Sequence, residues 1–177
     1  MDVTGTKMNK VYIDDKILKS YVSNIARQIT IARWRPDYIV GVTRGGLIPA
    51  TMLSHWMQVP MHTLNISLRD SDEIGPESNL WMAEDAFGHD MDRPKNILIV
   101  DDINDSGATL DWIKQDWASG CFPHDSKWDQ VWHENVRFAV LVNNEASEFK
   151  RIDYAASYIN KAEEDKWIVF PWENWWE

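Results

Sequence analysis

The chain has 177 residues, of which 44% are apolar, which is enough for one domain with a sizeable core and too few for two comfortable ones. Its 28 acidic and 18 basic side chains give a formal net charge of −10, and such a surface repels a phosphate backbone, so no nucleic-acid partner is expected. The single cysteine, Cys121, excludes an internal disulfide and a thiolate metal cluster.

No part of the sequence has the length and apolar content of a membrane span, and the first ten residues (MDVTGTKMNK) have no apolar signal core. We therefore expect a soluble cytoplasmic protein with no membrane partner, in which residues 1–177 form a single domain. The negative net charge does not exclude anionic small molecules, because main-chain N–H groups and a divalent cation can bind them.

The first part of the chain alternates between helical and extended patterns. Apolar residues recur at helical spacing over 14–35, and an aspartate precedes them as a capping residue. The β-branched run at 37–42 (DYIVGV) predicts a buried strand. After the turn residues TRGG, the segment 47–57 predicts a helix, in which Pro49 fits only the first turn.

The rest of the chain is richer in strands. Short apolar runs predict strands at 61–68, 97–100, 136–142, 153–159 and 166–172, and a helical pattern covers about 109–117. Strands that alternate with helices are typical of an α/β fold with a mostly parallel sheet flanked by helices. We expect that fold here.

Two stretches, 69–95 and 118–135, show no clean period. The first is acidic and contains glycine and proline, and a loop of that length in a compact domain is usually a functional lid or disordered. The second is rich in tryptophan and histidine, and the sequence assigns no role to it.

Two loops that follow predicted strands carry residues suited to anions, and ligands of open α/β sheets bind beyond the carboxyl ends of strands. The first loop is Thr43-Arg44-Gly45-Gly46. Its paired glycines let main-chain N–H groups approach an anion, and Arg44 offers forked donors to phosphate oxygens. By itself this pattern is weak, because it more often marks a tight turn before a helix.

The second loop lies in the stretch ILIVDDINDSGATL at 97–110. Asp101 and Asp102 end a strand, and neighbouring carboxylates suit the hydroxyls of a ribose or an Mg²⁺ ion. The small residues after Asp105 lie where a helix begins, and free N–H groups there form a phosphate cradle. Asp105 itself is placed for proton transfer to a ring nitrogen. A solvated acidic turn would explain one of these polar residues, not the whole set.

These motifs resemble a known family. The stretch ILIVDDINDSGATL is similar to the signature of the type I phosphoribosyltransferases. The upstream GVTRGGLIP and the C-terminal KWIVFPWE resemble the 6-oxopurine branch, closest to the xanthine-guanine phosphoribosyltransferases. The resemblance covers about residues 12–176.

The resemblance implies an enzyme of purine salvage. Such an enzyme transfers the 5-phosphoribosyl group of phosphoribosyl pyrophosphate to guanine, xanthine or hypoxanthine, releases pyrophosphate and depends on Mg²⁺. It implies a lid at about 69–95 and a small base-binding hood at about 153–177. Because relatives form dimers and tetramers, it also implies a homo-oligomer.

The resemblance also assigns roles around the sugar phosphate. Asp101 and Asp102 would take the ribose hydroxyls, directly and through Mg²⁺, and Asp105 would face the purine N7 as the acid/base group. The 5′-phosphate would lie against Asp105, Ser106, Gly107, Ala108 and Thr109. Thr43, Arg44 and Gly45 would hold the pyrophosphate, in a loop that often contains a non-proline cis peptide in this family.

The resemblance also implies a base site, although two features of this sequence differ from the family. Trp167 would stack on the purine, the main chain of Ile168 would read its edge, and Glu173 would lie near a second metal ion. Asn144 stands where the family has a lysine that donates to the purine O6, and an amide can donate or accept, so the base preference stays open. The lid lacks the family's Ser-Tyr pair.

A second interpretation retains the fold without catalysis, as a regulator that binds phosphoribosyl pyrophosphate or a nucleotide. The presence of all three loop aspartates favours the enzyme. A phosphoreceiver domain is disfavoured because it would leave the first 95 residues outside the domain. A P-loop site and a Rossmann cofactor site are also unsupported, because neither the GxxxxGK[ST] motif nor the GxGxxG motif occurs.

Overall fold

The computed structural model describes residues 8–66, 79–90 and 92–177. Its elements are β1 (Asn9–Tyr12), α1 (Asp15–Ile31), β2 (Tyr38–Val42), α2 (Leu47–Met57), β3 (Met61–Leu64), α3 (Leu80–Phe87), β4 (Ile97–Asn104), α4 (Ala108–Gly120), the 3-10 helix η1 (Ser126–Gln130), β5 (Val136–Asn144), β6 (Tyr154–Ile159) and β7 (Lys166–Val169). None of the helices in these described ranges has the length and apolar content to cross a membrane.

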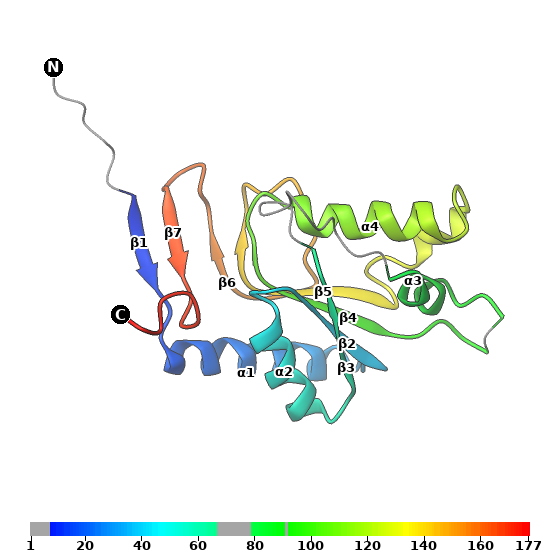
Figure 1. Cartoon of the computed structure of the whole chain (residues 1–177), viewed down its shortest axis with the longest axis horizontal. Coiled ribbons are helices and arrows are strands. Elements are labelled where there is room, and N and C mark those ends of the chain that lie inside the picture. The colour runs from blue at the N-terminus through cyan, green and yellow to red at the C-terminus, as the bar shows by residue number, and fades with distance from the viewer. Residues whose placement is uncertain (1–7, 67–78, 91) are drawn as a thin grey trace, which may run out of the picture.

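Five strands form one parallel sheet in the order β3-β2-β4-β5-β6. In β4, Ile97 and Ile99 pack on one face with α3 and α4, whereas Leu98 and Val100 pack on the other with α1 and α2. Figure 1 shows the two pairs of helices on opposite sides of the sheet. Burial on both faces explains why the central strands read as continuous apolar runs. The predicted α/β fold with a mostly parallel sheet flanked by helices is confirmed.

A second sheet of two parallel strands, β1 and β7, lies at one end of the molecule (Figure 1). The predicted hood of residues 153–177 has a different boundary, because β6 pairs with β5 in the central sheet. The hood therefore comprises residues 160–177 together with β1. The sequence did not predict β1, since three of its four residues are exposed and no apolar pattern marks it.

The predicted loop over 69–95 is wrong for part of its length. Residues 80–87 form α3, and Met82, Ala83, Ala86 and Phe87 are buried against the sheet and α4. These apolar residues form two adjacent pairs that lie one helical turn apart. The segment is too short to show a clear helical period among its acidic neighbours. Residues 69–78 of the predicted lid lie outside the described residues.

The insertion at 118–135 contributes to the core. It contains the end of α4 and η1, and the buried Trp128 donates its indole N–H to the main-chain oxygen of Cys121 at 2.9 Å. Trp128 also stacks on Trp132, with ring centroids 5.3 Å apart. The stretch therefore adds aromatic packing beside α4, at a distance from the ends of the strands where ligands are expected.

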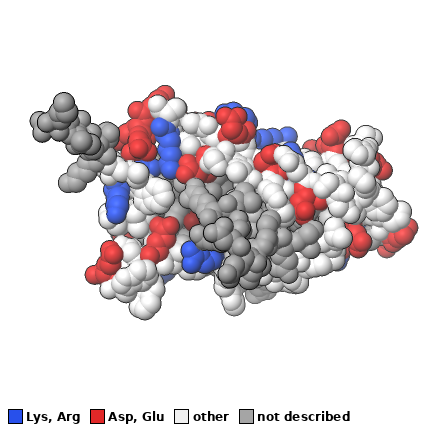
Figure 2. All heavy atoms as spheres, turned by 45° about the horizontal axis from the view of Figure 1, so that its top comes forward, with Lys and Arg blue, Asp and Glu red and all other residues white. Residues whose placement is uncertain are grey.

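The surface reflects the acidic composition. Figure 2 shows acidic side chains spread over one face with basic ones between them, and no continuous basic patch among the described residues of that face. The described residues of this face therefore lack the continuous positive charge that commonly binds a nucleic-acid backbone.

Candidate active site

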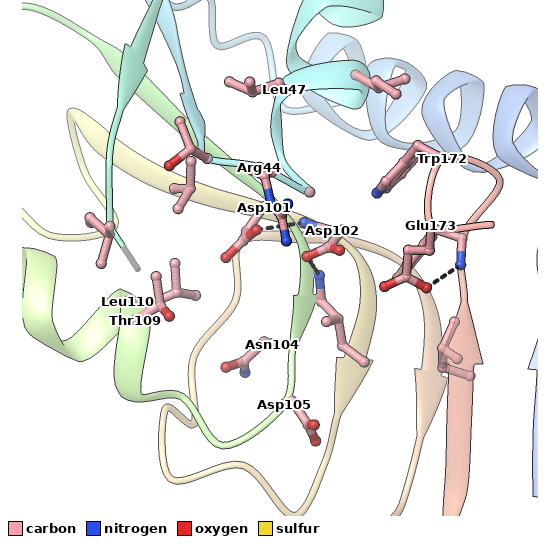
Figure 3. A pocket seen from close by; sticks show the side chains of 18 of the residues that line it. Arg44, Leu47, Asp101, Asp102, Asn104, Asp105, Thr109, Leu110, Trp172 and Glu173 are labelled. Carbon is pink, nitrogen blue, oxygen red and sulfur yellow. Dashed lines mark hydrogen bonds between the residues drawn. The ribbon is translucent and has the colours of Figure 1, made fainter. Parts of the chain in front are cut away.

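A cavity of about 1270 Å³ opens beyond the carboxyl ends of β2 and β4 (Figure 3). Three segments line it: the loop that follows β2, the end of β4 with the loop into α4, and the hood. Parallel pairing brings the first two together, because Gly41 of β2 lies opposite Val100 of β4, β2 ends at Val42, and Asp101 and Asp102 follow directly in β4. Both loops that the sequence singled out therefore meet at one cavity.

Asp101 and Asp102 lie within β4, which continues past the predicted end at residue 100 because it still pairs with β5. Asp101 is buried and accepts a hydrogen bond from the Asp102 N–H at 2.9 Å. Burial raises the pKa of Asp101 well above its usual range, and the neighbouring charge of Asp102 raises it further. Adjacent carboxylates of this kind favour a cation beside them.

The donor set fits Mg²⁺. This ion takes oxygen ligands and is commonly held by one or two carboxylates, with water and substrate phosphates in its remaining positions. Asp101 and Asp102 offer such oxygens on the cavity wall. Within the described residues, no three His, Cys, Asp or Glu side chains converge on a closed metal site. Any ion here would therefore be completed by the substrate.

The glycine loop packs directly on the end of β4. A Cβ atom on Gly45 would overlap the carboxylate of Asp102, and one on Gly46 would overlap the main-chain oxygen of Val100. The peptide bond between Thr43 and Arg44 is cis, as the family resemblance led us to expect. Figure 3 shows Arg44 at the same wall of the cavity as the β4 aspartates. The absence of a side chain at position 45 thus brings the main chain against these aspartates.

The loop from β4 into α4, where the sequence predicts a phosphate cradle, turns sharply at Gly107. Gly107 has φ of 91°, a left-handed conformation that favours glycine, and a Cβ there would lie 2.5 Å from the Phe149 main-chain nitrogen. The Ser106 main-chain oxygen accepts from Glu148 N–H at 3.0 Å, which holds the loop from behind. The first N–H groups of α4 have no partners inside the helix, the Ala108 N–H donates to Ser106 Oγ at 3.3 Å, and the first turn of α4 lines the cavity.

Asp105 is held by two side chains. Lys161 donates from Nζ to Oδ2 at 2.8 Å, and the Asn144 amide donates to the Asp105 main-chain oxygen at 3.0 Å. The sequence did not identify Lys161, which lies 56 positions further along the chain. One signal was available, because Lys161 comes two residues after β6 and therefore lies at the same edge of the parallel sheet.

Asn144 has a different place from the expected one. Its side chain is buried, and it is not among the described residues that line the cavity. The amide group faces Asp105, and its oxygen accepts from the main-chain N–H of Lys161 at 3.0 Å. Asn144 therefore supports the wall of the site, and its contact with a base stays a prediction.

The hood supplies aromatic and acidic groups. The Trp167 side chain is 38% exposed and lines the cavity with Ile168. Glu173 lies across the cavity from Asp102 (Figure 3), and its Oε2 accepts from the Phe170 N–H at 2.9 Å. An exposed indole face over a cavity suits a flat aromatic ligand. The cavity thus combines anion-binding loops at one end with a stacking surface at the other.

Known proteins are similar to this chain in sequence. Xanthine phosphoribosyltransferase 1 of Saccharomyces cerevisiae is 23% identical over 188 residues, which cover 93% of this chain and 90% of that protein. Xanthine-guanine phosphoribosyltransferase of Cereibacter sphaeroides is 29% identical over 141 residues, covering 79% of this chain and 70% of that protein. Each of these two alignments covers most of this chain and most of the relative.

Solved structures agree. The purine phosphoribosyltransferase of Pyrococcus horikoshii superposes with a TM-score of 0.65 at 26% identity, covering 94% of this chain and 95% of that one. The Helicobacter pylori xanthine-guanine-hypoxanthine phosphoribosyltransferase shares the fold, with a TM-score of 0.66 at 19% identity and coverage of 93% and 94%. The sequence model of the phosphoribosyl transferase domain matches residues 13–174, a span that includes the central sheet and all of the residues that line the cavity except Trp176. The chain therefore belongs to the phosphoribosyl transferase domain family.

Proposed function

We propose that the protein transfers the 5-phosphoribosyl group of phosphoribosyl pyrophosphate to a 6-oxopurine (guanine, xanthine or hypoxanthine) in purine salvage. The observation that carries this proposal is the convergence of the glycine loop, the β4 aspartates and the α4 cradle on one cavity. The named activities of the relatives from S. cerevisiae and C. sphaeroides support the choice of a 6-oxopurine.

The sugar phosphate would bind at the sheet end of the cavity. The 5′-phosphate would accept hydrogen bonds from the main-chain N–H groups of the cradle at residues 105–109. Asp101 and Asp102 would accept from the ribose hydroxyls, and the same carboxylates would hold Mg²⁺, with Glu173 near a second ion. The ion would supply positive charge to the pyrophosphate as it departs.

The pyrophosphate would lie against Thr43, Arg44 and Gly45, where the closely packed glycine loop gives main-chain donors access to it. The C1′–oxygen bond to pyrophosphate breaks, the carbon gains oxocarbenium character, and a ring nitrogen of the purine forms the new bond to C1′. Arg44 stabilises the charge that develops on the leaving group. Asp105 accepts the proton that the base gives up.

The base would lie at the hood end. Trp167 presents an exposed indole face for stacking, and the main chain of Ile168 would read the edge of the purine. Such stacking places the ring nitrogen near C1′ and helps to exclude water, which would otherwise attack the activated sugar.

The experiment is a panel of bases. Purified protein with Mg²⁺ and phosphoribosyl pyrophosphate should release pyrophosphate with at least one of guanine, xanthine and hypoxanthine, and none without a base. Phosphoribosyl pyrophosphate binding should be measured in parallel by calorimetry. Binding without release for any purine would overturn the enzyme and favour the regulator.

A further inference from the structure

One cation lies at the junction of the proposed acid/base group and the proposed stacking surface. The side chain of Lys161, in the connection between β6 and β7, is 18% exposed and lines the cavity. Its Nζ atom is 2.8 Å from Oδ2 of Asp105 and 5.6 Å from the ring centroid of Trp167. The ammonium group therefore lies over the indole ring and next to the Asp105 carboxylate, beside the place where a base would stack.

Asn144 fixes the relative position of the two charged residues. It accepts from the main-chain N–H of Lys161 at 3.0 Å and donates to the main-chain oxygen of Asp105 at 3.0 Å. The buried amide thus ties together the two backbones that carry the ion pair. The separation of the ammonium and the carboxylate is set by these anchors as well as by the lysine stem.

The spacing matches one edge of a purine. The ring nitrogen N7 and the substituent at C6 are neighbours on that edge, and in guanine a single lysine or arginine can contact both N7 and O6. If N7 faces Asp105, the C6 substituent faces Lys161. An ammonium group donates hydrogen bonds and accepts none, so it suits an oxo group and opposes an amino group.

We propose that Lys161 is a specificity-determining residue, whose ammonium group donates to the 6-oxo group of the base and selects oxopurines over aminopurines. This inference rests on the proposed function. The alternative role is an ion pair that only holds Asp105, and that role would affect every base by the same factor.

The test compares hypoxanthine with unsubstituted purine, which lacks the 6-oxo group and the N1 proton that accompanies it. In the wild type, kcat/KM should favour hypoxanthine strongly. In Lys161→Met, kcat/KM for hypoxanthine should fall by about 10- to 100-fold, the range for a hydrogen bond to a charged group, and that for purine should fall much less. The ratio between the two bases should therefore approach one.

Two variants serve as controls. Lys166→Met removes a hood lysine that pairs with Glu164 at 2.8 Å and does not line the cavity, so both values should change less than twofold. Lys161→Arg retains a cationic donor and should retain the preference for hypoxanthine. Circular dichroism and thermal melts establish that each variant is folded.

The outcomes separate the inference from the proposed function. An equal loss for both bases in Lys161→Met, or no loss, overturns the role of Lys161 in selection. If the wild type shows no turnover, the same ratio is read from dissociation constants in the presence of phosphoribosyl pyrophosphate. A preference for hypoxanthine that depends on Lys161 would then support the inference while the proposed function fails. Equal binding of the two bases would overturn the inference whatever the turnover.

Discussion

The carboxylates at the two ends of the central sheet have opposite environments. At the amino end, Asp37 accepts two hydrogen bonds from Arg93, both at 2.8 Å, and one from the Asn96 N–H at 2.7 Å. The hydrogen bonds from Arg93 hold the pKa of Asp37 below its usual range. At the carboxyl end, Asp101 is buried beside Asp102, and its pKa is raised by burial and by that neighbour.

This contrast separates stability from ligand binding. At the amino end the charge is satisfied within the protein, so its loss should affect folding. At the carboxyl end, the two neighbouring aspartates repel each other as long as no cation lies between them, and strongly shifted pKa values of this kind are common in functional sites. Substitutions at the carboxyl end should therefore change activity more than stability, and substitutions at the amino end should do the reverse.

The largest expected effect is at Asp105. Asp105→Asn removes the proton acceptor, so kcat should fall by about 10²- to 10⁴-fold, the range for loss of general acid–base catalysis. Binding of phosphoribosyl pyrophosphate, measured by calorimetry, should change little, because the cradle donors are main-chain groups. Turnover close to that of the wild type would assign proton transfer to another group.

Removal of divalent cations tests the proposed Mg²⁺ site at the carboxyl end of the sheet without a substitution. Chelation should lower pyrophosphate release by about 100-fold or more, since a cation supplies several kcal/mol of charge stabilisation, and added Mg²⁺ should restore it. The melting temperature of the protein without substrate should stay the same, because Asp101 and Asp102 alone do not form a closed metal site. Full activity in chelator would remove the ion from the proposal.

The glycine loop offers a smaller, paired test. In Gly45→Ala the new Cβ displaces the carboxylate of Asp102, which can rotate, so affinity for phosphoribosyl pyrophosphate should fall about tenfold while stability is nearly unchanged. In Gly46→Ala the Cβ meets main-chain oxygens of Val100 and Val42, which cannot rotate away. That variant should lose about 1–3 kcal/mol of unfolding free energy.

For both glycine variants, calorimetry measures the affinity for phosphoribosyl pyrophosphate and denaturant unfolding measures the free energy of unfolding. Equal destabilisation by the two substitutions would contradict the difference between a side-chain and a main-chain neighbour. A loss of stability in Gly45→Ala alone would mean that the loop is anchored through Asp102.

Local sequence predicted much of this site. The run from Ile97 to Thr109 encodes its own strand, turn and helix start, and neighbouring positions carry its chemistry, so sequence spacing alone indicated the cradle. The glycine loop could be recognised for the same reason. In the fold, the alternation of strands and helices identified the α/β class, because each element of the central sheet is marked by its own apolar pattern.

The features that the sequence missed depend on distant partners. β1 pairs with β7 across most of the chain, from Asn9 to Lys166, and its own residues carry no apolar signal. Lys161 meets Asp105 only because β4 and β6 end at the same edge of the parallel sheet. The position of Asn144 suggested a contact with the base, but only the fold shows that its amide is turned toward those two residues.

The smallest expected effect is at the amino end, in Asp37→Asn. The neutral amide weakens the pairing with Arg93, and because the site is partly exposed to solvent the loss should be about 1 kcal/mol or less of unfolding free energy at pH 7. Turnover should stay the same, because Asp37 lies at the opposite end of the sheet from the cavity.

The pH dependence of that loss makes the test specific. Because the pKa of Asp37 is lower in the folded state than its ordinary value of 3.8, the carboxylate stabilises the protein above that value, and the contribution disappears as pH falls through the folded-state pKa. The stability difference between wild type and Asp37→Asn, measured by denaturant unfolding, should therefore be constant near neutrality and vanish in strong acid. A difference that persists at low pH would come from packing or the hydrogen bond of Asn96, and the amino end would then be stabilised by shape and not by charge.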